Sequence, residues 1–238
     1  MAVLAEERAL PTVVEAVPAA DPAPLGLAAF ALTTFILSGH NASFIPDIAW
    51  LGLAFFYGGL VQLLAGMWEF RNRNVFGATA FSTYGGFWMA LGFFVTLILV
   101  SKTAADAIAG ANLLNGLAWF LLAFSIFNFY MLLWSSRINL AVFGVFLTLQ
   151  ITEVLLAIGF WVAAHRGVAP TGAEVGFIRA GGWAGIVTAA VAWYASAALV
   201  LSAMNEGRAI LPVGKALWTG QRFSFGQRRR LGQAHPAR

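Results

Sequence analysis

The chain has 238 residues, of which 60% are hydrophobic and only 10% are charged. A soluble domain carries about 25% charged residues, so this composition excludes an ordinary soluble domain and predicts an integral membrane protein. The sequence has no cysteine, which excludes disulfides, thiolate metal sites and cysteine nucleophiles.

The N-terminal residues 1–20 lack the basic start and the apolar core of a signal peptide, and a short disordered arm is the simpler interpretation. The segment Asp21-Pro22-Ala23-Pro24-Leu25-Gly26-Leu27 follows. Its two prolines fix φ and remove backbone donors, which suits the first turn of a helix but not its interior. This segment therefore predicts a rigid start to the first membrane helix.

Six long apolar runs follow one another along the chain, and only the fifth contains an acidic or basic residue. They cover residues 22–46, 48–68, 74–101, 107–136, 138–164 and 180–205. Each is long enough for the ~20 residues that cross roughly 30 Å of hydrocarbon. Because the connections are short, the sequence predicts an all-α, polytopic membrane protein with six transmembrane helices in one bundle, as a single domain over residues 21–214.

The basic residues are distributed unequally between the two ends of these spans. With six spans both termini lie on one side, and eleven of the 14 basic residues fall there, most of them in residues 208–238. The positive-inside rule places that side in the cytoplasm, at the plasma (cytoplasmic) membrane. Residues 215–238 are expected to form a basic cytoplasmic tail, either solvated and disordered or attracted to anionic lipid.

Glu153 is the one acidic residue inside a span, close to mid-membrane and one helical turn from Leu149. A charged acid there costs about 2.5–3.5 kcal/mol on insertion scales, so we expect the side chain to face the bundle interior in its protonated form. It is a candidate for proton coupling. The alternative is a protonated glutamate hydrogen-bonded within the bundle or at a subunit contact.

Other acids and glycines are expected to have structural roles. Glu69 and Glu206, at helix ends, are expected to form exposed ion pairs with nearby arginines, and such pairs contribute little to stability. The GxxxG of Gly181–Gly185 is typical of close helix packing, within or between protomers.

Several further motifs accompany the segment 21–27 in a fixed order. They are Ala28-Ala29-Phe30, Thr33-Thr34, His40-Asn41, Phe56-Tyr57-Gly58-Gly59, Gln62, Ala65-Gly66, Glu69, Phe76-Gly77, Thr79-Ala80-Phe81, Tyr84-Gly85, Phe87-Trp88, Leu155-Leu156-Ala157-Ile158-Gly159, Asn205-Glu206 and Leu211-Pro212-Val213-Gly214. Together they resemble the acetate uptake transporter family, which includes succinate–acetate permeases. The family signature begins with Asn where this chain has Asp21. Both can accept a hydrogen bond at a helix N-cap, and Asp adds a charge favourable to the helix dipole.

The resemblance implies six-helix protomers that assemble as hexamers, each enclosing its own pathway in a lipid bilayer. It implies transport of acetate and related small carboxylates, with succinate among the substrates of some members. Whether movement is a channel flux or a proton symport stays open at this point. No cofactor, metal or nucleic acid is expected.

By resemblance, a pore constriction falls on Phe30, Tyr84 and Leu149. An apolar neck of this kind excludes ions that shed water poorly. The alternative for Phe30 and Leu149 is ordinary helix packing, and for Tyr84 a position in the interfacial aromatic belt.

Polar side chains near these positions are candidates to line the pathway, because a carboxylate that loses its hydration needs hydrogen-bond donors. They are Thr33, Thr34, Gln62, Ser82, Thr83 and Gln150, with Asn128 in mid-span of the fourth run. The alternative for each hydroxyl is a bond back to its own helix carbonyl. For Gln62, burial beside a functional partner is favoured.

Three other functions are alternatives to transport of carboxylates: an enzyme, a channel for another small solute, and a scaffold. The sequence shows no P-loop, no HExxH and no cluster of polar catalytic groups at one depth, so no enzymatic activity is predicted. The alternatives are a small-solute channel of the urea type or for another anion, and a non-transporting membrane scaffold.

Overall fold

The computed structural model describes residues 19–46, 48–107, 111–168 and 175–218, and within these ranges all regular structure is helical. The elements are α1 (Ala23–Asn41), α2 (Ala49–Phe55), the π-helical η1 (Phe56–Val61), α3 (Gln62–Arg71), α4 (Val75–Val100), α5 (Lys102–Ala107), α6 (Ala111–Ser135), α7 (Leu140–Arg166) and α8 (Gly176–Met204). The prediction of an all-α fold is confirmed.

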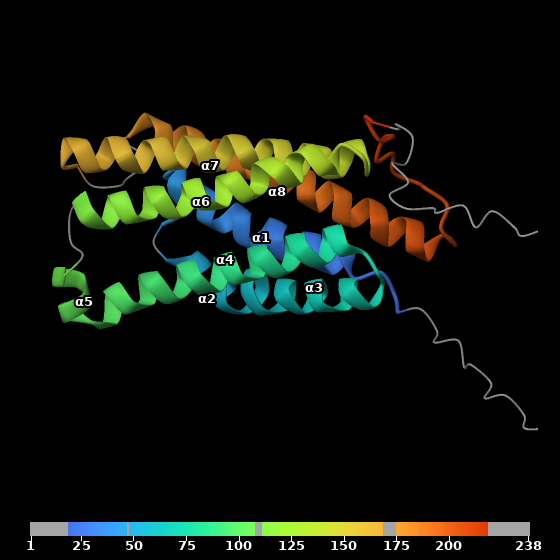
Figure 1. Ribbon diagram of the computed structural model, residues 1–238, viewed down its shortest axis with the longest axis horizontal. Helices are drawn as coiled ribbons and strands as arrows, with labels where there is room; N and C mark the ends of the chain where they lie inside the picture. Colours follow the sequence, from blue (N-terminus) through green and yellow to red (C-terminus); the bar gives the residue numbers. More distant parts are fainter. Residues whose placement is uncertain (1–18, 47, 108–110, 169–174, 219–238) are drawn as a thin grey trace, which may run out of the picture.

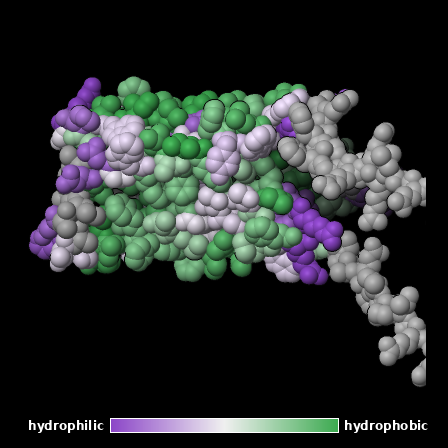
Figure 2. Space-filling view, viewed as in Figure 1, coloured by the Kyte–Doolittle hydropathy of each residue, from purple (hydrophilic) through white to green (hydrophobic). Residues whose placement is uncertain are grey.

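Six of the helical segments are long and apolar enough to cross a membrane, which confirms the predicted number of spans. The second span is the continuous helix Ala49–Arg71, formed by α2, η1 and α3. In Figure 2 an apolar surface lies between two ends that carry the hydrophilic residues, as a membrane protein requires. The sequence did not predict the short α5 after the third span, nor the start of α8 at Gly176, ahead of Arg179.

Helix α1 has a central place in the bundle (Figure 1). It packs against α8 on one side and against η1 and α3 on the other. Helices α6, α7 and α8 pack in series, and α3 packs along α4, whereas α4 and α6 touch each other little. The first span therefore joins two groups of helices, and its side chains reach the space between them.

Both described ends of the chain lie at the same end of the bundle (Figure 1). Before α1, the carbonyl of Ala20 accepts a hydrogen bond from Asn72 Nδ2 at 3.3 Å. After α8, the backbone N–H of Leu217 donates to Ser136 O at 2.8 Å. This agrees with six spans. The predicted disordered arm and most of the basic tail lie outside the described residues.

The proline-rich segment begins α1 as predicted. Asp21 Oδ1 accepts a hydrogen bond from the Ala23 N–H at 2.9 Å, and Pro24 lies in the first helical turn. The carbonyl of Pro24 accepts a 2.7 Å hydrogen bond from Ser196 Oγ of α8. At Gly26 an added Cβ would lie 2.8 Å from the Phe81 ring of α4, so glycine permits this close approach. The motif thus connects α1 to both α4 and α8.

The glycines of the α8 segment 181–185, which contains the GxxxG, also pack within the protomer. An added Cβ at Gly182 would lie 2.7 Å from the backbone oxygen of Ser38, and one at Gly185 would lie 2.9 Å from Ser38 Cβ. These small residues let α8 approach the backbone of α1, as the sequence predicted for close helix packing.

Candidate functional site: two cavities that meet at a partition

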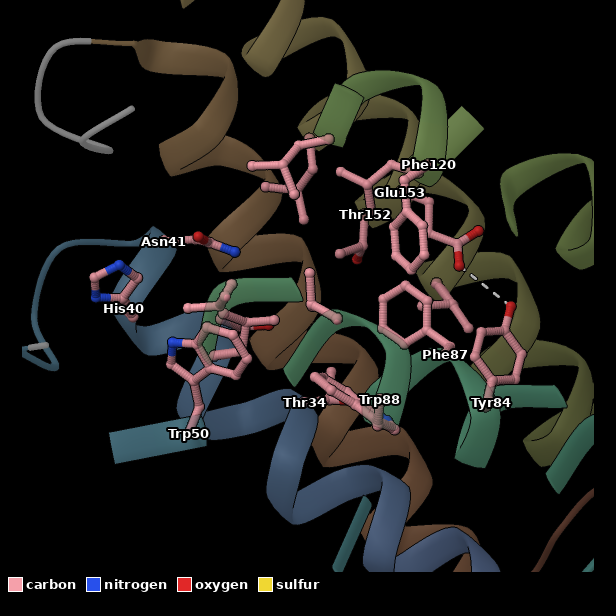
Figure 3. A pocket seen from close by; sticks show the side chains of 18 of the residues that line it. Thr34, His40, Asn41, Trp50, Tyr84, Phe87, Trp88, Phe120, Thr152 and Glu153 are labelled. Carbon is pink, nitrogen blue, oxygen red and sulfur yellow. Dashed lines mark hydrogen bonds between the residues drawn. The ribbon is translucent and has the colours of Figure 1, made fainter. Parts of the chain in front are cut away.

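A first cavity, of about 260 Å³, lies between the middle of the bundle and the end of α1 at which His40 is exposed. We call it the His40 cavity (Figure 3). Its polar lining consists of Thr34, Ser38, His40, Asn41, Thr152 and Glu153, and its aromatic lining includes Trp50, Phe87, Trp88 and Phe120. Figure 3 shows His40 and Asn41 at one end of this cavity and Tyr84 at the other.

A second cavity, of about 230 Å³, lies towards the end of the bundle that holds both described chain ends. We call it the Glu69 cavity. Its polar lining consists of Asp21, Gln62, Glu69, Asn74 and Asn139, and apolar side chains of α1, α4 and α7 complete it.

Phe30, Tyr84 and Leu149 line both cavities, and among the described residues no other side chain does so. All three are buried. The rings of Phe30 and Tyr84 meet edge to face with centroids 5.8 Å apart, a favourable aromatic geometry. The three residues, from α1, α4 and α7, therefore form a partition between the two cavities.

A hydrogen-bond network holds the tyrosine of this partition. Tyr84 Oη lies 3.0 Å from Asn128 Oδ1 and 3.2 Å from Glu153 Oε1 (Figure 3 shows the bond to Glu153). Asn128 Nδ2 donates to Phe146 O at 2.9 Å and to Gln150 Oε1 at 2.9 Å. Because both N–H groups of the Asn128 amide are used, its oxygen faces Tyr84 as an acceptor.

The two contacts of Tyr84 Oη bear on the protonation of Glu153. The Tyr84 hydroxyl has one proton, and Asn128 Oδ1 can only accept it. Tyr84 Oη can donate that proton to Glu153 Oε1 instead, and both contacts are hydrogen bonds at once only when the carboxyl of Glu153 is protonated and donates to Tyr84 Oη. Glu153 is 3% exposed, which agrees with a neutral carboxyl.

In the structure, the polar residues predicted to line the pathway are distributed between the two cavities, and some of them line neither. Thr34 lines the His40 cavity and Gln62 lines the Glu69 cavity. Thr33 lines neither; its hydroxyl donates to Ala29 O at 3.0 Å, which is the alternative considered for such residues. Ser82 and Thr83 also line neither cavity.

Gln150 contributes to the network rather than to a cavity wall. Its Nε2 donates to Ser125 Oγ at 2.6 Å, and its Oε1 accepts from Asn128. Asn128, which the sequence placed only in mid-span, is therefore the residue that orients Tyr84. An uncharged amide at that depth was the available signal, but the sequence does not show which span it faces.

The expectation of exposed ion pairs at Glu69 and Glu206 is wrong. Glu69 is 1% exposed and turns inward, towards the Glu69 cavity, because α3 places it between α1 and α4. Within the described ranges the ion pair present is Lys102–Asp106, at 2.8 Å on the surface of α5. Neither glutamate has an arginine partner there.

The described lining of the two cavities contains acidic side chains but no lysine or arginine to pair with them. Asp21 and Glu69 line the Glu69 cavity and Glu153 lines the His40 cavity. His40, at the mouth of its cavity, is the one basic-type side chain among these lining residues.

These features define a multi-pass helical membrane protein with two internal cavities separated by a buried partition. A sequence profile of the GPR1/FUN34/yaaH family matches residues 8–213. The chain belongs to this family, which confirms the resemblance found in its sequence.

Named relatives include transport proteins of fungi and bacteria. The chain is 40% identical over 192 residues to accumulation of dyads protein 2 of Saccharomyces cerevisiae, covering 79% of this chain and 63% of that protein. It is 40% identical over 217 residues to acetate permease A of Emericella nidulans, covering 87% of this chain and 70% of the permease. It thus spans somewhat less than two thirds of the yeast relative's length.

A bacterial relative matches over nearly its whole length. The succinate-acetate/proton symporter SatP of Escherichia coli is 34% identical over 200 residues, covering 83% of this chain and 96% of SatP. A solved structure of the bacterial acetate channel SatP superposes with a TM-score of 0.70 at 31% identity, covering 82% of this chain and 99% of that one.

Proposed function

We propose that this protein transports acetate and related small carboxylates, succinate among them, across the membrane together with protons. The observation that carries this proposal is the partition: two cavities approach each other from opposite ends of the bundle, and among the described residues they share Phe30, Tyr84 and Leu149 alone. The relatives named as acetate permease A and as a succinate-acetate/proton symporter support the choice of substrate.

The chemistry of the partition suits a small acid with one apolar end. Phe30 and Leu149 present hydrocarbon to a methyl group, and an apolar neck excludes ions that keep their hydration shell. The hydroxyl of Thr34 and the amide of Gln62 lie in the cavities on the two sides of this neck. They would supply hydrogen bonds to the carboxyl end before and after it passes.

Glu153 is the group that would link this movement to protons. Its carboxyl borders the His40 cavity and bonds to the tyrosine of the partition. An ionised Glu153 would repel a carboxylate in the cavity, whereas a protonated Glu153 would not. Passage of the acid would therefore be easiest while Glu153 holds its proton, and transport would depend on pH.

The orientation and assembly also belong to this proposal. Charge placement puts both termini in the cytoplasm of a plasma (cytoplasmic) membrane. The family resemblance suggests a hexamer, and exposed aromatic residues on α6 offer a surface for lipid or for neighbouring protomers. The mass of the particle in detergent would test the hexamer.

The experiment is uptake of labelled acetate by the purified protein in liposomes. Flux above that of empty liposomes supports transport, and its absence with folded protein would favour a scaffold. Labelled urea in the same vesicles tests the runner-up small-solute channel. Protons entering with acetate would indicate symport, and acetate entering without them would indicate a channel.

The Glu153→Gln variant tests the proton link. Glutamine keeps the size and the hydrogen bonding of a protonated glutamate but cannot titrate, so uptake should lose its pH dependence while insertion stays intact. Uptake with an unchanged pH profile would remove Glu153 from the mechanism.

A further inference from the structure

Glu69 differs from Asp21 and Glu206, the other described acids at its end of the bundle, because it is buried, and no described residue forms an ion pair with it. Its side chain is 1% exposed, and its Oε1 accepts no hydrogen bond from the described residues. Arg71 and Arg73 are close in sequence but exposed, and neither forms an ion pair with it. A buried carboxylate without a cationic neighbour is costly in its charged form and is neutral while it holds a proton.

Asn74 and Gly77, at the start of α4, shape the surroundings of the Glu69 carboxyl. Asn74 Oδ1 caps α4 by accepting the Gly77 N–H at 3.1 Å, and the Asn74 side chain lies beside the carboxyl of Glu69, whose Oε1 stays without a donor. An added Cβ at Gly77 would lie 2.7 Å from Glu69 Oε1 and 2.6 Å from Asn74 Nδ2. Glycine at this position therefore provides the space that the carboxyl occupies.

A second unpartnered acceptor faces the same cavity. Gln62 is 1% exposed, lines the Glu69 cavity, and its Oε1 has no donor among the described residues. Two buried oxygen acceptors without donors, at one cavity, match a ligand that brings its own hydrogen-bond donor. The hydroxyl of an undissociated carboxylic acid is such a donor, whereas a carboxylate anion is not.

One acid and two amides line the Glu69 cavity beside Glu69 and Gln62. Asp21, ahead of α1, lines the same cavity and has the same sign of charge. From α4 and from the start of α7 the polar neighbours are Asn74 and Asn139, which are neutral. No described lysine, arginine or histidine lines this cavity, so no basic side chain of its described lining competes with a proton for the carboxyl of Glu69.

We propose that Glu69 is the proton-exchange site of the Glu69 cavity, on the opposite side of the partition from Glu153. This inference rests on the proposed transport of carboxylic acids. An undissociated acid that has crossed the partition transfers its proton to ionised Glu69: the O–H bond of the acid breaks, and an O–H bond to the carboxyl of Glu69 forms. The carboxylate leaves with the negative charge, and Glu69 then releases the proton to water. Movement in the other direction uses the same steps in reverse.

The test compares Glu69→Gln, Glu69→Asp and the control Glu206→Gln, which removes an exposed acid near the same end of the bundle. In liposomes, Glu69→Gln should lose accumulation of labelled acetate driven by a pH gradient but keep exchange of acetate at equal pH. Glu69→Asp should keep gradient-driven accumulation with a shifted pH profile, and Glu206→Gln should behave as the unmodified protein.

The comparison of the first two variants separates a chemical role from a structural one. Glutamine reproduces the shape of glutamate and aspartate reproduces its acidity, so a purely structural role predicts that Gln is the better substitute. Normal accumulation in Glu69→Gln, or a poorer result in Glu69→Asp than in Glu69→Gln, would overturn the proposal.

A spectroscopic measurement that does not depend on transport tests the role of Glu69 independently of the proposed function. Infrared difference spectra of the purified protein between acidic and neutral pH should contain the band of a buried carboxyl group. The contribution of Glu69 to this band should be lost in Glu69→Gln and kept in Glu206→Gln, while the contribution of buried Glu153 stays in both. An unmodified protein that shows the band but no acetate flux would contradict the proposed function, and an unchanged band in Glu69→Gln would contradict the role of Glu69.

Discussion

The substitution Tyr84→Phe removes one hydroxyl from the partition and leaves its ring in place. The ring packs edge to face against Phe30 and Phe127, with centroids 5.8 and 5.6 Å away, and phenylalanine keeps both contacts. The substitution removes the hydrogen bonds of Tyr84 Oη with Asn128 Oδ1 and with Glu153 Oε1. The width of the partition should therefore stay the same while its polar support disappears.

The magnitude follows from the burial of these groups. Tyr84 is 4% exposed, so the Asn128 oxygen and the Glu153 carboxyl would lose a partner that water does not readily replace. An unsatisfied buried polar group costs about 1–3 kcal/mol, and we expect Tyr84→Phe to lower the free energy of unfolding by an amount in that range. Uptake should also depend on pH differently, since Glu153 loses its hydroxyl neighbour.

The assay is thermal unfolding in detergent, followed by acetate uptake in liposomes over a range of pH. The matched control is Tyr130→Phe, which removes an exposed hydroxyl from α6 and should change neither property. If Tyr84→Phe were as stable as Tyr130→Phe and kept the original pH profile, the network would not hold the partition.

Two further changes test the partition and the packing behind it. Leu149→Ala should join the two cavities and admit larger carboxylates, at a cost of about 2–5 kcal/mol in stability; equal substrate selectivity in Leu149→Ala and in the exposed control Leu147→Ala would argue against a constriction. Gly182→Ala places a methyl group against the backbone of α1 and should destabilise by about 1–3 kcal/mol. Gly52→Ala, where an added Cβ meets nothing within 4 Å, should not destabilise, and equal thermal stability of these two glycine variants would contradict the α1–α8 contact.

The number of spans could be predicted from the sequence because each membrane-crossing helix is one continuous stretch of the chain. Every span needs a long apolar run, and its backbone must satisfy its own hydrogen bonds as a helix. The start of α1 was readable for a similar local reason, since prolines are tolerated only in the first turn. The resemblance then suggested Phe30, Tyr84 and Leu149, and the structure brings these three residues together between two cavities.

The sequence did not predict which face of each helix turns towards the interior of the bundle. All the long helices are apolar around their whole circumference, because lipid and protein interior are equally apolar, so periodicity does not show which side turns inward. Thr33 and Thr34 are neighbours on α1, yet Thr34 reaches a cavity and Thr33 bonds back to its own helix.

The sequence by itself determined the class of this protein: six apolar helices, a proline-stiffened beginning and one acid at mid-membrane depth. Only the tertiary structure decided what its polar groups do. Glu69 appeared in the sequence as one more charge beside arginines at a helix end, and the packing of α3 against α1 and α4 turned it inward instead. Tyr84, Asn128 and Glu153 lie on three different helices and meet only when those helices pack, because a hydrogen bond depends on distance in space rather than along the chain.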